Sequence, residues 1–521
     1  MPKHRPITKI LIPNRGEIAV RIIRAAHDLG LAAAVVYSEP DRESLAVRLA
    51  DEAYPIGPAP SSESYLRAEA IVELASEIGA DAVHPGYGFL SERASFARLC
   101  RDAGLTFIGP PPEAIAAMGS KTESRRLMME ANVPVVPGGA EPLADLDAAV
   151  AEAERIGYPV MLKAAAGGGG KGMRHVETAD DLAAAFRAAR SEAAASFGDD
   201  AVYLERFLVD PRHVEIQVLA DQHGRVVSLG ERECSLQRRH QKVVEEAPSP
   251  VVDAELRRRM GEAAVAAAEA VGYTNAGTVE FLLDGNGTGG TQNFFFLEMN
   301  TRLQVEHPVT ELVTGLDLVT WQIRIAQGEE LPESMAAIEP HGHAVEVRLY
   351  AEDAYRNFAP SPGTIRYLRL PEGPGVRNDS GVDTGSVVSV HYDPMLAKLI
   401  CWGEDREQAL DRLRRALGEL RVEGIQTTVP LFRALLDDDD FRAGRLDIGM
   451  LDRKLAAGEL DPPAGDTVAP SLADDLPLVA AALEHHAEAR RRAAGAGAVA
   501  ARLRTRWRMA GRREATGREA R

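Results

Sequence analysis

The sequence predicts an α/β protein with several domains, and three observations lead to this fold class. The first hundred residues alternate between short apolar runs and stretches with helical spacing, which is typical of a parallel sheet covered by helices. After residue 200 the pattern changes to successive strands in which polar and apolar residues alternate. The length of 521 residues corresponds to about three or four domains.

The N-terminal region is expected to be Rossmann-like. Residues 9–13 predict a strand, residues 16–29 a helix that ends at Gly30, and residues 33–37 the next strand. The turn after the first strand reads Asn14-Arg15-Gly16-Glu17, so the Gly-x-Gly-x-x-Gly fingerprint of dinucleotide-binding folds is absent. The other elements expected in this region are a helix at 68–78 and strands at 81–84 and 106–109.

Proline-rich and glycine-rich segments divide the rest of the chain. Pro110, Pro111 and Pro112 mark a boundary, residues 133–139 are a connection, and residues 461–465 read as a linker before an Ala/Arg-rich tail. The elements expected between them are strands at 159–163, 202–207, 213–219, 226–230, 344–350 and 422–426, helices at 180–195, 255–271 and 407–419, and a hairpin with strands at 278–283 and 294–299.

Charge and composition exclude several classes of protein. The net charge of −18 argues against an obligate nucleic-acid binder, because the nucleic-acid backbone is also anionic, but a small polyphosphate can still bind in a locally basic cleft. Cys100, Cys234 and Cys401 are too widely spaced for a disulfide framework or a zinc site. We find no signal peptide and no apolar run near the ~18 residues of a membrane span, so we expect a cytoplasmic protein.

Lysine is rare among the cations of this chain, because only eight of its 60 basic residues are lysines and the rest are arginines. A lysine that remains is therefore a candidate for a role that needs a compact charge. Chance survival is an adequate explanation for three of them (Lys3, Lys9 and Lys454). The other five are Lys121, Lys163, Lys171, Lys242 and Lys398.

A glycine-rich run at residues 167–172 follows the strand that ends at Lys163. Successive glycines let backbone N–H groups approach phosphate oxygens without obstruction by Cβ atoms, and Lys163 and Lys171 add positive charge. The run does not match the Walker A pattern. A phosphate-binding loop and a simple flexible loop are both compatible with it.

The predicted hairpin carries a candidate metal site. If its turn centres on Gly289, Glu280 lies opposite Glu298, and two facing carboxylates repel each other unless a cation lies between them. Asn300 is expected on the same face as Glu298. Such oxygen ligands suit Mg²⁺ or Mn²⁺, which also bridge nucleotide phosphates. The alternative, two solvated glutamates on an outer face, is disfavoured by the apolar residues 294–296.

Two further segments are dense in Arg, Glu and His. Residues 301–308 directly follow the hairpin and indicate a reaction centre, although a surface salt bridge is the simpler alternative. Residues 231–242 end in Lys242, which argues against a merely solvated loop. A nucleophilic role for Cys234 is disfavoured, because no partner base is identifiable.

These features together resemble the ATP-grasp ligases, and most closely the biotin carboxylase component of biotin-dependent carboxylases, over about residues 7–455. The sequence strings that carry the resemblance are 14–19 (NRGEIA), 84–92 (HPGYGFLSE), 118–121 (MGSK), 163–173, 213–217 (HVEIQ), 234–246 and 298–308 (EMNTRLQVEHP).

The resemblance implies a domain organisation. We expect a pre-ATP-grasp α/β domain at 1–118, an ATP-grasp domain at 119–330 with a mobile lid at about 136–207, and a C-terminal α+β domain at 340–455. Residues 456–521 would be a linker and a basic tail.

The resemblance also implies roles for individual residues. Lys121 and Lys163 match phosphate-binding lysines, and Gly169 and Gly170 match a loop that closes over ATP. The residues implied to hold the adenine are Glu205, Arg206, Phe207 and Leu208. Those implied to make further nucleotide contacts are His213, Gln237 and His240. The implied metal ligands are Glu280, Glu298 and Asn300, of which the two glutamates also count as nucleotide-site residues. The implied bicarbonate and biotin site comprises Lys242, Arg302, Val305 and Arg348, with Glu306 as general base.

The implied reaction is the ATP- and bicarbonate-dependent carboxylation of biotin through carboxyphosphate, the first half-reaction of an acyl-CoA carboxylase. No lysine lies in an Ala-Met-Lys-Met-like context, so we expect the biotin on a separate carrier protein, with a carboxyltransferase subunit as a further partner. A homodimer or larger complex is also expected. The acyl acceptor stays open. The alternatives are a carbamoyl-phosphate-forming ATP-grasp ligase and a non-catalytic ATP-binding subunit.

Overall fold

The computed structural model describes residues 6–139, 142–165, 173–239, 241–284, 292–461 and 482–486. The chain divides into two units, residues 1–461 and 462–521. In the second unit the described residues are one helical turn at 482–486. The predicted tail therefore lies largely outside the described residues.

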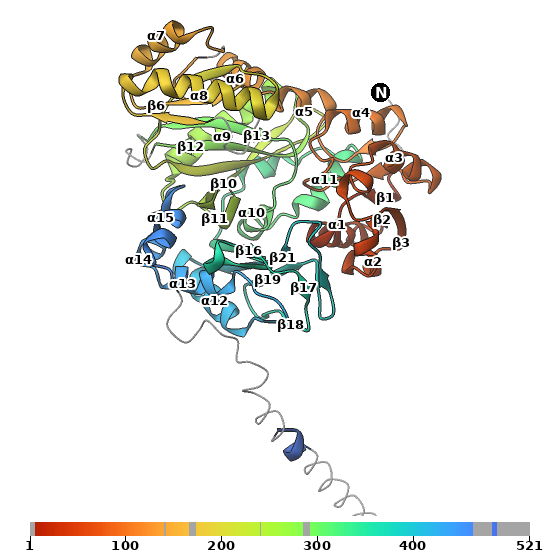
Figure 1. The fold of residues 1–521 in the computed structure, drawn as a ribbon. Coiled ribbons are helices and arrows are strands. Elements are labelled where there is room, and N and C mark those ends of the chain that lie inside the picture. Colours follow the sequence, from red (N-terminus) through yellow and green to blue (C-terminus); the bar gives the residue numbers. More distant parts are fainter. Residues whose placement is uncertain are drawn as a thin grey trace, which may run out of the picture. The chain divides into compact units, whose positions relative to one another are not determined.

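A five-stranded parallel sheet forms the N-terminal part of the first unit, in the order β3-β2-β1-β4-β5 (Figure 1). The apolar face of α1 packs on it, because Ile18, Ile22 and Ala26 are buried against the strands. The Rossmann-like expectation is thus confirmed, although strand β3 was missed. The elements here are β1 (Lys9–Ile12), α1 (Gly16–Asp28), β2 (Ala32–Ser38), α2 (Leu45–Leu49), β3 (Glu52–Gly57), α3 (Ala68–Glu77), β4 (Ala82–Val83), α4 (Ala94–Asp102) and β5 (Thr106–Phe107).

A small antiparallel sheet, β7-β6-β8, follows two connecting helices. Helices α7 and α8 pack on this sheet, and their buried residues Ala153, Leu182 and Phe186 form a separate small core (Figure 1). The elements are α5 (Pro112–Met118), α6 (Lys121–Glu130), α7 (Leu146–Ile156), β6 (Val160–Ala164), β7 (Arg174–Val176), α8 (Ala179–Phe197) and β8 (Val202–Arg206).

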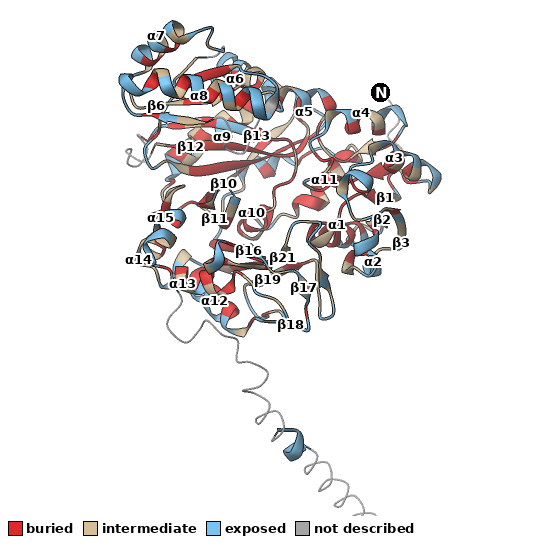
Figure 2. Ribbon diagram, in the orientation of Figure 1, coloured by how far each residue is buried: buried red, intermediate tan, exposed pale blue. Residues whose placement is uncertain are grey.

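An eight-stranded antiparallel sheet, in the order β13-β12-β9-β10-β11-β14-β21-β19, is the centre of the unit. Helix α9 packs on β9 and β10, and these strands are buried along most of their length (Figure 2). The sheet runs from the predicted ATP-grasp segment into the predicted C-terminal segment. Its elements and its covering helices are β9 (Arg212–Ala220), β10 (Val226–Arg238), β11 (Gln241–Ala247), α9 (Ala254–Ala270), β12 (Asn275–Leu283), β13 (Phe294–Asn300), α10 (His307–Thr314), α11 (Leu318–Ala326), β14 (His343–Tyr350), β19 (Val376–Ser380) and β21 (Met395–Gly403).

The C-terminal helices of this unit pack around the far strands of the large sheet. Leu410, Leu413 and Leu417 of α12 bury one apolar face against β14 and β21. The elements are β15 (Glu352–Asp353), β16 (Ala359–Pro360), β17 (Gly363–Thr364), β18 (Tyr367–Arg369), β20 (Val387–Val388), α12 (Arg406–Glu419), β22 (Arg421–Glu423), α13 (Val429–Asp437), α14 (Asp439–Arg442) and α15 (Met450–Ala457).

The charged composition of segment 231–242 does not indicate that much of it lies in a buried strand. Strand β10 continues through Glu231, Arg232 and Glu233 to Arg238, and these three side chains are buried. Residues 231–238 are therefore part of a sheet strand whose buried charges are ion-paired. None of the described helices is long and apolar enough to span a bilayer.

Candidate active site

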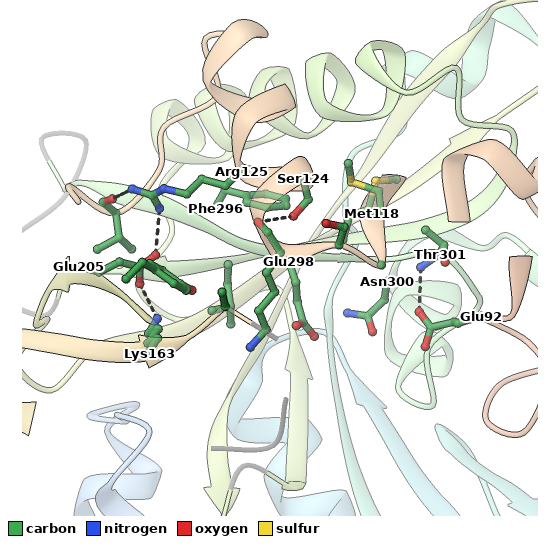
Figure 3. A pocket seen from close by; sticks show the side chains of 18 of the residues that line it. Glu92, Met118, Ser124, Arg125, Lys163, Glu205, Phe296, Glu298, Asn300 and Thr301 are labelled. Atoms are coloured by element: carbon green, nitrogen blue, oxygen red, sulfur yellow. Dashed lines mark hydrogen bonds and ion pairs between the residues drawn. The ribbon is translucent and has the colours of Figure 1, made fainter. Parts of the chain in front are cut away.

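A first cavity of about 720 Å³ lies between α5, α6, the small sheet and strand β13. Glu205 of β8 faces it between two cations (Figure 3). Arg125 Nη1 donates to one carboxylate oxygen at 2.9 Å, and Lys163 Nζ donates to the other at 2.5 Å. Arg125 also donates to the carbonyl of Val136 at 2.6 Å, so the connection at 133–139 is tied to the cavity wall.

Lys121 is the second lysine of this cavity, and it begins helix α6 directly after the capping residue Ser120. Burial and the nearby charge of Lys163 lower the pKa of Lys121 below its ordinary value. An anion bound between the two lysine side chains would relieve their mutual repulsion. The cavity wall therefore carries three cations, Lys121, Arg125 and Lys163, beside the carboxylates of Glu92, Glu205 and Glu298.

The hairpin pairs Glu280 of β12 with Glu298 of β13, as predicted from the sequence. Glu280 is buried, and its Oε2 lies 3.1 Å from His213 Nε2. Burial raises the pKa of Glu280, but Lys242 and His213 outweigh it and hold that pKa well below the usual range. Burial and the charge of Glu280 raise the pKa of Glu298.

The donor set of the hairpin fits a hard divalent cation. The carboxylates of Glu280 and Glu298 lie on facing strands, and Asn300 follows on the same face as Glu298. Burial and then the charge of Glu280 raise the pKa of Glu298, and an Mg²⁺ ion bound here would relieve the repulsion between the two carboxylates.

A second cavity, of about 820 Å³, adjoins the first. Glu298 and Asn300 line both cavities. Two of the three expected metal ligands, Glu298 and Asn300, therefore lie where the two cavities meet, and the third, Glu280, lines the second cavity. The other predicted residues that line the second cavity are His213, Lys242, Glu280, Arg302, Val305 and Arg348.

Lys242 of β11 is the centre of a buried carboxylate cluster. Its Nζ donates to Glu215 at 2.5 Å, to Glu280 at 2.8 Å and to Glu306 at 2.7 Å. Burial opposes the charge, but the three carboxylates raise the pKa of Lys242 well above its ordinary value. Lys242 is therefore a permanent cation at the end of the second cavity.

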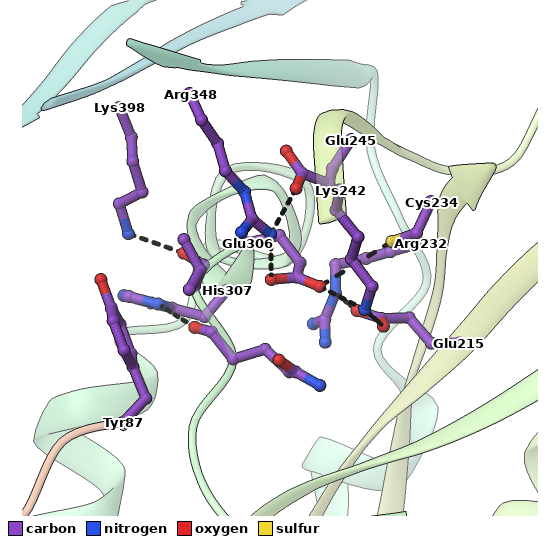
Figure 4. Close-up of polar contacts among 12 residues, drawn as sticks. Tyr87, Glu215, Arg232, Cys234, Lys242, Glu245, Glu306, His307, Arg348 and Lys398 are labelled. Atoms are coloured by element: carbon purple, nitrogen blue, oxygen red, sulfur yellow. Dashed lines mark hydrogen bonds and ion pairs between the residues drawn. The ribbon is translucent and has the colours of Figure 1, made fainter. Parts of the chain in front are cut away.

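Glu306 lies behind the cavity wall between two cations (Figure 4). Its Oε1 accepts from Lys242, and its Oε2 accepts from Arg348 Nη2 at 3.0 Å. Burial favours the neutral form, but Lys242, Arg348 and Arg232 hold the pKa of Glu306 well below the usual range. Arg348 also pairs with Glu245 at 2.5 Å, and burial raises the pKa of Glu245 to about 7.

Arg302 lines the second cavity, and its guanidinium is fixed by four acceptors, one of which is the carbonyl of Leu303 at 3.3 Å. Its Nε donates to Glu92 at 2.8 Å, Nη1 to Gln304 at 2.8 Å and Nη2 to Asn300 at 3.0 Å. Glu92 belongs to the N-terminal sheet region, so this bond links that region to the hairpin. The guanidinium is held in one orientation, which an anion-binding residue requires.

Several predicted residues lie away from the described cavity walls. Phe207 packs its ring on His175 at 4.1 Å, Arg206 is exposed, and Leu208 is buried. Gln237 donates to His213 Nδ1 at 2.9 Å and so supports a cavity residue. Gly169, Gly170 and His240 lie outside the described residues.

The structure also contains functional neighbours that the sequence reasoning did not single out. Arg232 is buried and donates to Glu215 at 2.5 Å, so it holds the carboxylate that in turn holds Lys242. Arg125 contacts Glu205, which lies 80 positions away along the chain, and Glu92 contacts Thr301, which lies 209 positions away. In the sequence, Glu92 lies in the string 84–92 and Arg232 in the charged segment 231–242. Only these two motifs could have indicated either residue. The thiol of Cys234 is buried, which raises its pKa well above the ordinary value and makes it a poor nucleophile.

Comparison with known proteins places this site in a family. The model described as "Biotin carboxylase, N-terminal domain" matches residues 6–115, "Carbamoyl-phosphate synthase L chain, ATP binding domain" matches 120–334, and "Biotin carboxylase C-terminal domain" matches 346–453. Biotin carboxylase 2 of Bacillus subtilis is 53% identical over 448 residues, which are 86% of this chain and 100% of that protein.

The chain belongs to the biotin carboxylase family. It has the ATP-grasp fold of that family and is an ATP-dependent ligase. A solved structure of the biotin carboxylase domain dimer of Hydrogenobacter thermophilus 2-oxoglutarate carboxylase, in complex with MgADP, ADP and bicarbonate, superposes with a TM-score of 0.81 at 46% identity. The match covers 88% of this chain and 99% of that one.

Some biotin carboxylase relatives are longer than the matching region. The mitochondrial methylcrotonoyl-CoA carboxylase subunit alpha of Oryza sativa is 52% identical over 450 residues, and the match spans 60% of its length. The family match therefore establishes a biotin-dependent carboxylase subunit and not the acyl substrate.

Proposed function

We propose that this chain carboxylates biotin on a separate biotin carboxyl carrier protein, with ATP and bicarbonate as substrates, as the first half-reaction of an acyl-CoA carboxylase. The observation that carries the proposal is the pair of adjoining cavities that share Glu298 and Asn300. The first cavity is large enough for a nucleotide and has Lys121 and Lys163 in its wall, and the second is lined by Lys242, Arg302 and Arg348.

In the first cavity, Lys121 and Lys163 would bind the phosphates of ATP. Lys163 is paired with Glu205 in the described structure, so phosphate binding would draw its ammonium away from that carboxylate. Glu205 would then keep Arg125 as its partner and remain available to the nucleotide. Gly169 and Gly170 would close over the phosphates and exclude water from a labile intermediate.

Glu280, Glu298 and Asn300 would hold Mg²⁺ or Mn²⁺. The bound ion supplies charge neutralisation at the transferring phosphoryl group. The magnesium in the Hydrogenobacter relative supports Mg²⁺ as the ion used by this chain.

In the second cavity, Glu306 would take the proton of bicarbonate, and the resulting oxyanion would attack the γ-phosphorus of ATP and expel ADP. The low pKa of Glu306 keeps the carboxylate deprotonated, but it also weakens the base. A bicarbonate anion bound by Lys242 and Arg302 would compete for the cations around Glu306 and raise that pKa. Since Glu306 is fully buried, access requires its ion pair with Lys242 or Arg348 to open.

The carboxyphosphate formed in this step would break its carboxyl carbon–oxygen bond to give CO2 and phosphate. The phosphate released would take the proton of biotin N1, and the deprotonated N1 would then attack the carbon of CO2. Arg348 would stabilise the negative charge on the ureido oxygen of biotin. Arg302 and the backbone of Val305 would hold the anionic intermediate. Arg348, Arg302 and the Val305 backbone would each donate to an oxygen on which negative charge develops during the reaction. Such electrostatic stabilisation of the transition state is usually the largest contribution to enzymatic catalysis.

The carrier and the carboxyltransferase would be separate partners. Lys398, the described lysine nearest to the motif of a biotin attachment site in its sequence context, is fully buried and cannot accept biotin in the folded chain. We also propose a homodimer, which the dimer of the Hydrogenobacter relative supports, and a cytoplasmic location. The acyl acceptor would be chosen by the carboxyltransferase.

The decisive experiment measures ADP release by the purified chain with ATP and Mg²⁺, with and without bicarbonate and biotin. We expect release that requires both co-substrates, together with ¹⁴C-bicarbonate fixed on biotin or on a biotinyl carrier. Ammonia-dependent release without biotin would instead identify a carbamoyl-phosphate-forming ligase. Normal ATP binding without any release would identify a non-catalytic subunit.

A further inference from the structure

Lys398 is a fully buried lysine that the reaction described above does not use. It lies on β21, where the strand register places it between Arg348 of β14 and Asp379 of β19. Its ammonium lies 3.3 Å from Glu17 and 3.8 Å from Asp379. It also donates a hydrogen bond of 2.6 Å to the carbonyl oxygen of Val305.

The bond to Val305 is unusual for a buried ammonium. Removing a lysine from water is costly unless carboxylates compensate its charge, and here Glu17 and Asp379 supply that compensation. The shortest contact of the ammonium nevertheless goes to a neutral backbone carbonyl. Charge neutralisation alone therefore does not account for the geometry.

The carbonyl that Lys398 holds belongs to the peptide that leads into Glu306. Glu306 is the N-cap residue of helix α10, and the ring of His307 contacts the carbonyl of Gln304 at 2.8 Å. Two successive carbonyls before Glu306 are thus held by two buried side chains. This backbone carries both Val305, which lines the second cavity, and Glu306, which lies directly behind it.

A path of polar contacts connects this buried lysine with the cavity wall, and Figure 4 shows its two ends, Tyr87 and Lys398. Tyr87 lines the second cavity, and its hydroxyl donates to Glu17 in the first turn of α1. Glu17 in turn lies beside Lys398. The path therefore runs from Tyr87 through Glu17 and Lys398 to the carbonyl of Val305.

We propose that Lys398 is a positioning residue: its hydrogen bond to the Val305 carbonyl, supported by Glu17 and Tyr87, holds the backbone that presents Val305 and Glu306 to bicarbonate. The inference rests on the proposed function for its kinetic consequence, but the backbone restraint does not depend on it. The competing explanation is that Lys398 only neutralises the buried carboxylates of Glu17 and Asp379.

The first test compares Lys398→Met with a matched control, Lys454→Met. Lys454 is also an ammonium with several carboxylate partners, at 2.8 Å from Asp438 and 2.8 Å from Asp440, and it lies outside both cavities. Asp379 keeps its ion pair with Arg377 at 2.8 Å, but Lys398→Met leaves the buried carboxylate of Glu17 without its ammonium, so the double variant Glu17→Gln/Lys398→Met is prepared as well. Removing both members of a buried pair is far less disruptive than removing one.

For both Lys398 variants we expect kcat for bicarbonate-dependent ADP release to fall about tenfold to a hundredfold, and KM for bicarbonate to rise. KM for ATP should stay within twofold, because Lys398 does not touch the first cavity. The Lys454 variant should change kcat less than twofold, even where its melting temperature falls. Kinetic constants of the folded Lys398 variants within twofold of wild type would overturn the inference.

A double-mutant cycle separates positioning from general damage. If Lys398 acts through Glu306, the Lys398 substitution should add little to the loss already caused by Glu306→Gln. Full additivity of the two losses would instead support mere charge neutralisation and contradict the proposal.

Hydrogen–deuterium exchange provides a readout that does not need activity. We expect faster exchange in the peptide covering residues 301–310 in the Lys398 variants, and no change there in the Lys454 variant. Unchanged exchange in this peptide would refute the backbone restraint. An inactive wild-type chain would contradict the proposed function alone, because this measurement still decides the role of Lys398.

Discussion

Lys242 Nζ lies 2.7 Å from Glu306 Oε1, although the two residues are 64 positions apart in the chain. The same ammonium contacts Glu215 and Glu280, so one lysine joins the carboxylate proposed as base to a carboxylate proposed as metal ligand. A change in charge at one of these carboxylates changes the electrostatic potential at the other, because little water separates them. The proposed base and the proposed metal ligand are therefore electrostatically coupled through Lys242.

The first prediction concerns the base itself. Glu306→Gln keeps the shape of the side chain but removes its ability to accept a proton, so kcat for bicarbonate-dependent ADP release should fall by about 10²- to 10⁴-fold. Steady-state kinetics with a coupled ADP assay measures this loss. The rise in melting temperature caused by MgATP should stay as in wild type, because Glu306 does not line the nucleotide cavity. Unchanged carboxylation would refute the assignment of Glu306.

The second prediction concerns phosphate binding. Lys163→Met removes the ammonium that donates to Glu205 at 2.5 Å and that we expect to move to the phosphates of ATP. A hydrogen bond to a charged group contributes about 1.5–3 kcal/mol, so KM for ATP should rise roughly tenfold or more. KM for bicarbonate should change less than twofold. Lys9→Met, which removes an ion pair with Glu52 remote from both cavities, is the control. Equal effects of the two variants on KM for ATP would contradict the prediction.

Part of this site was predictable because hairpin pairing obeys local geometry. A turn centred on Gly289 requires Glu280 to face Glu298, and the structure has that pair together with Thr278 and Asn300. The register then shifts by one residue, so Phe281 faces Phe296. That bulge has no signature in the sequence, since it follows from how the strands twist and pack in the whole sheet.

Other parts depend on contacts that no local pattern encodes. Strand β3 was missed because Pro55 interrupts its apolar run, yet its place at the edge of the sheet tolerates a proline. Arg125 reaches Glu205 only after the small sheet has packed on α6, and Lys398 reaches Val305 only after β21 has joined the large sheet. Sequence motifs pointed to many residues that line the two cavities, whereas the partners of these residues are brought to them by the tertiary fold.

The third prediction tests the metal ligands. Glu298→Gln removes one of the two facing carboxylates and with it the repulsion from Glu280, so the folded state should not be destabilised. The Mg²⁺ concentration for half-maximal activity should rise about tenfold or more, because a charged ligand is lost. As a second readout, the Mg²⁺-dependent rise in melting temperature in the presence of ADP should shift to higher concentration. Glu255→Gln, an exposed glutamate of α9, is the control, and an identical Mg²⁺ dependence for both variants would exclude Glu298 as a ligand.

The fourth prediction concerns stability against acid. Glu246 is buried and lies 2.7 Å from His343 Nε2 and 2.6 Å from Arg406 Nε. Burial opposes ionisation, but His343 and Arg406 lower the pKa of Glu246 to about 2. Because the pKa of the folded state lies below the ordinary value of 4.5, the unfolded chain binds this proton first on acidification. The stabilisation is then complete above about pH 5 and is lost as the pH falls toward 2.

A shift of this size corresponds to roughly 3 kcal/mol at neutral pH. Glu246→Gln should therefore lower the melting temperature most at pH 7, and the difference from wild type should shrink steadily between pH 5 and pH 3. Differential scanning calorimetry across this range measures the difference directly. Other carboxylates titrate in both proteins and cancel in the comparison, and Glu255→Gln should give a small difference that does not vary with pH. A Glu246 difference that stays constant with pH would show that packing, and not the ion pairs with His343 and Arg406, accounts for the loss.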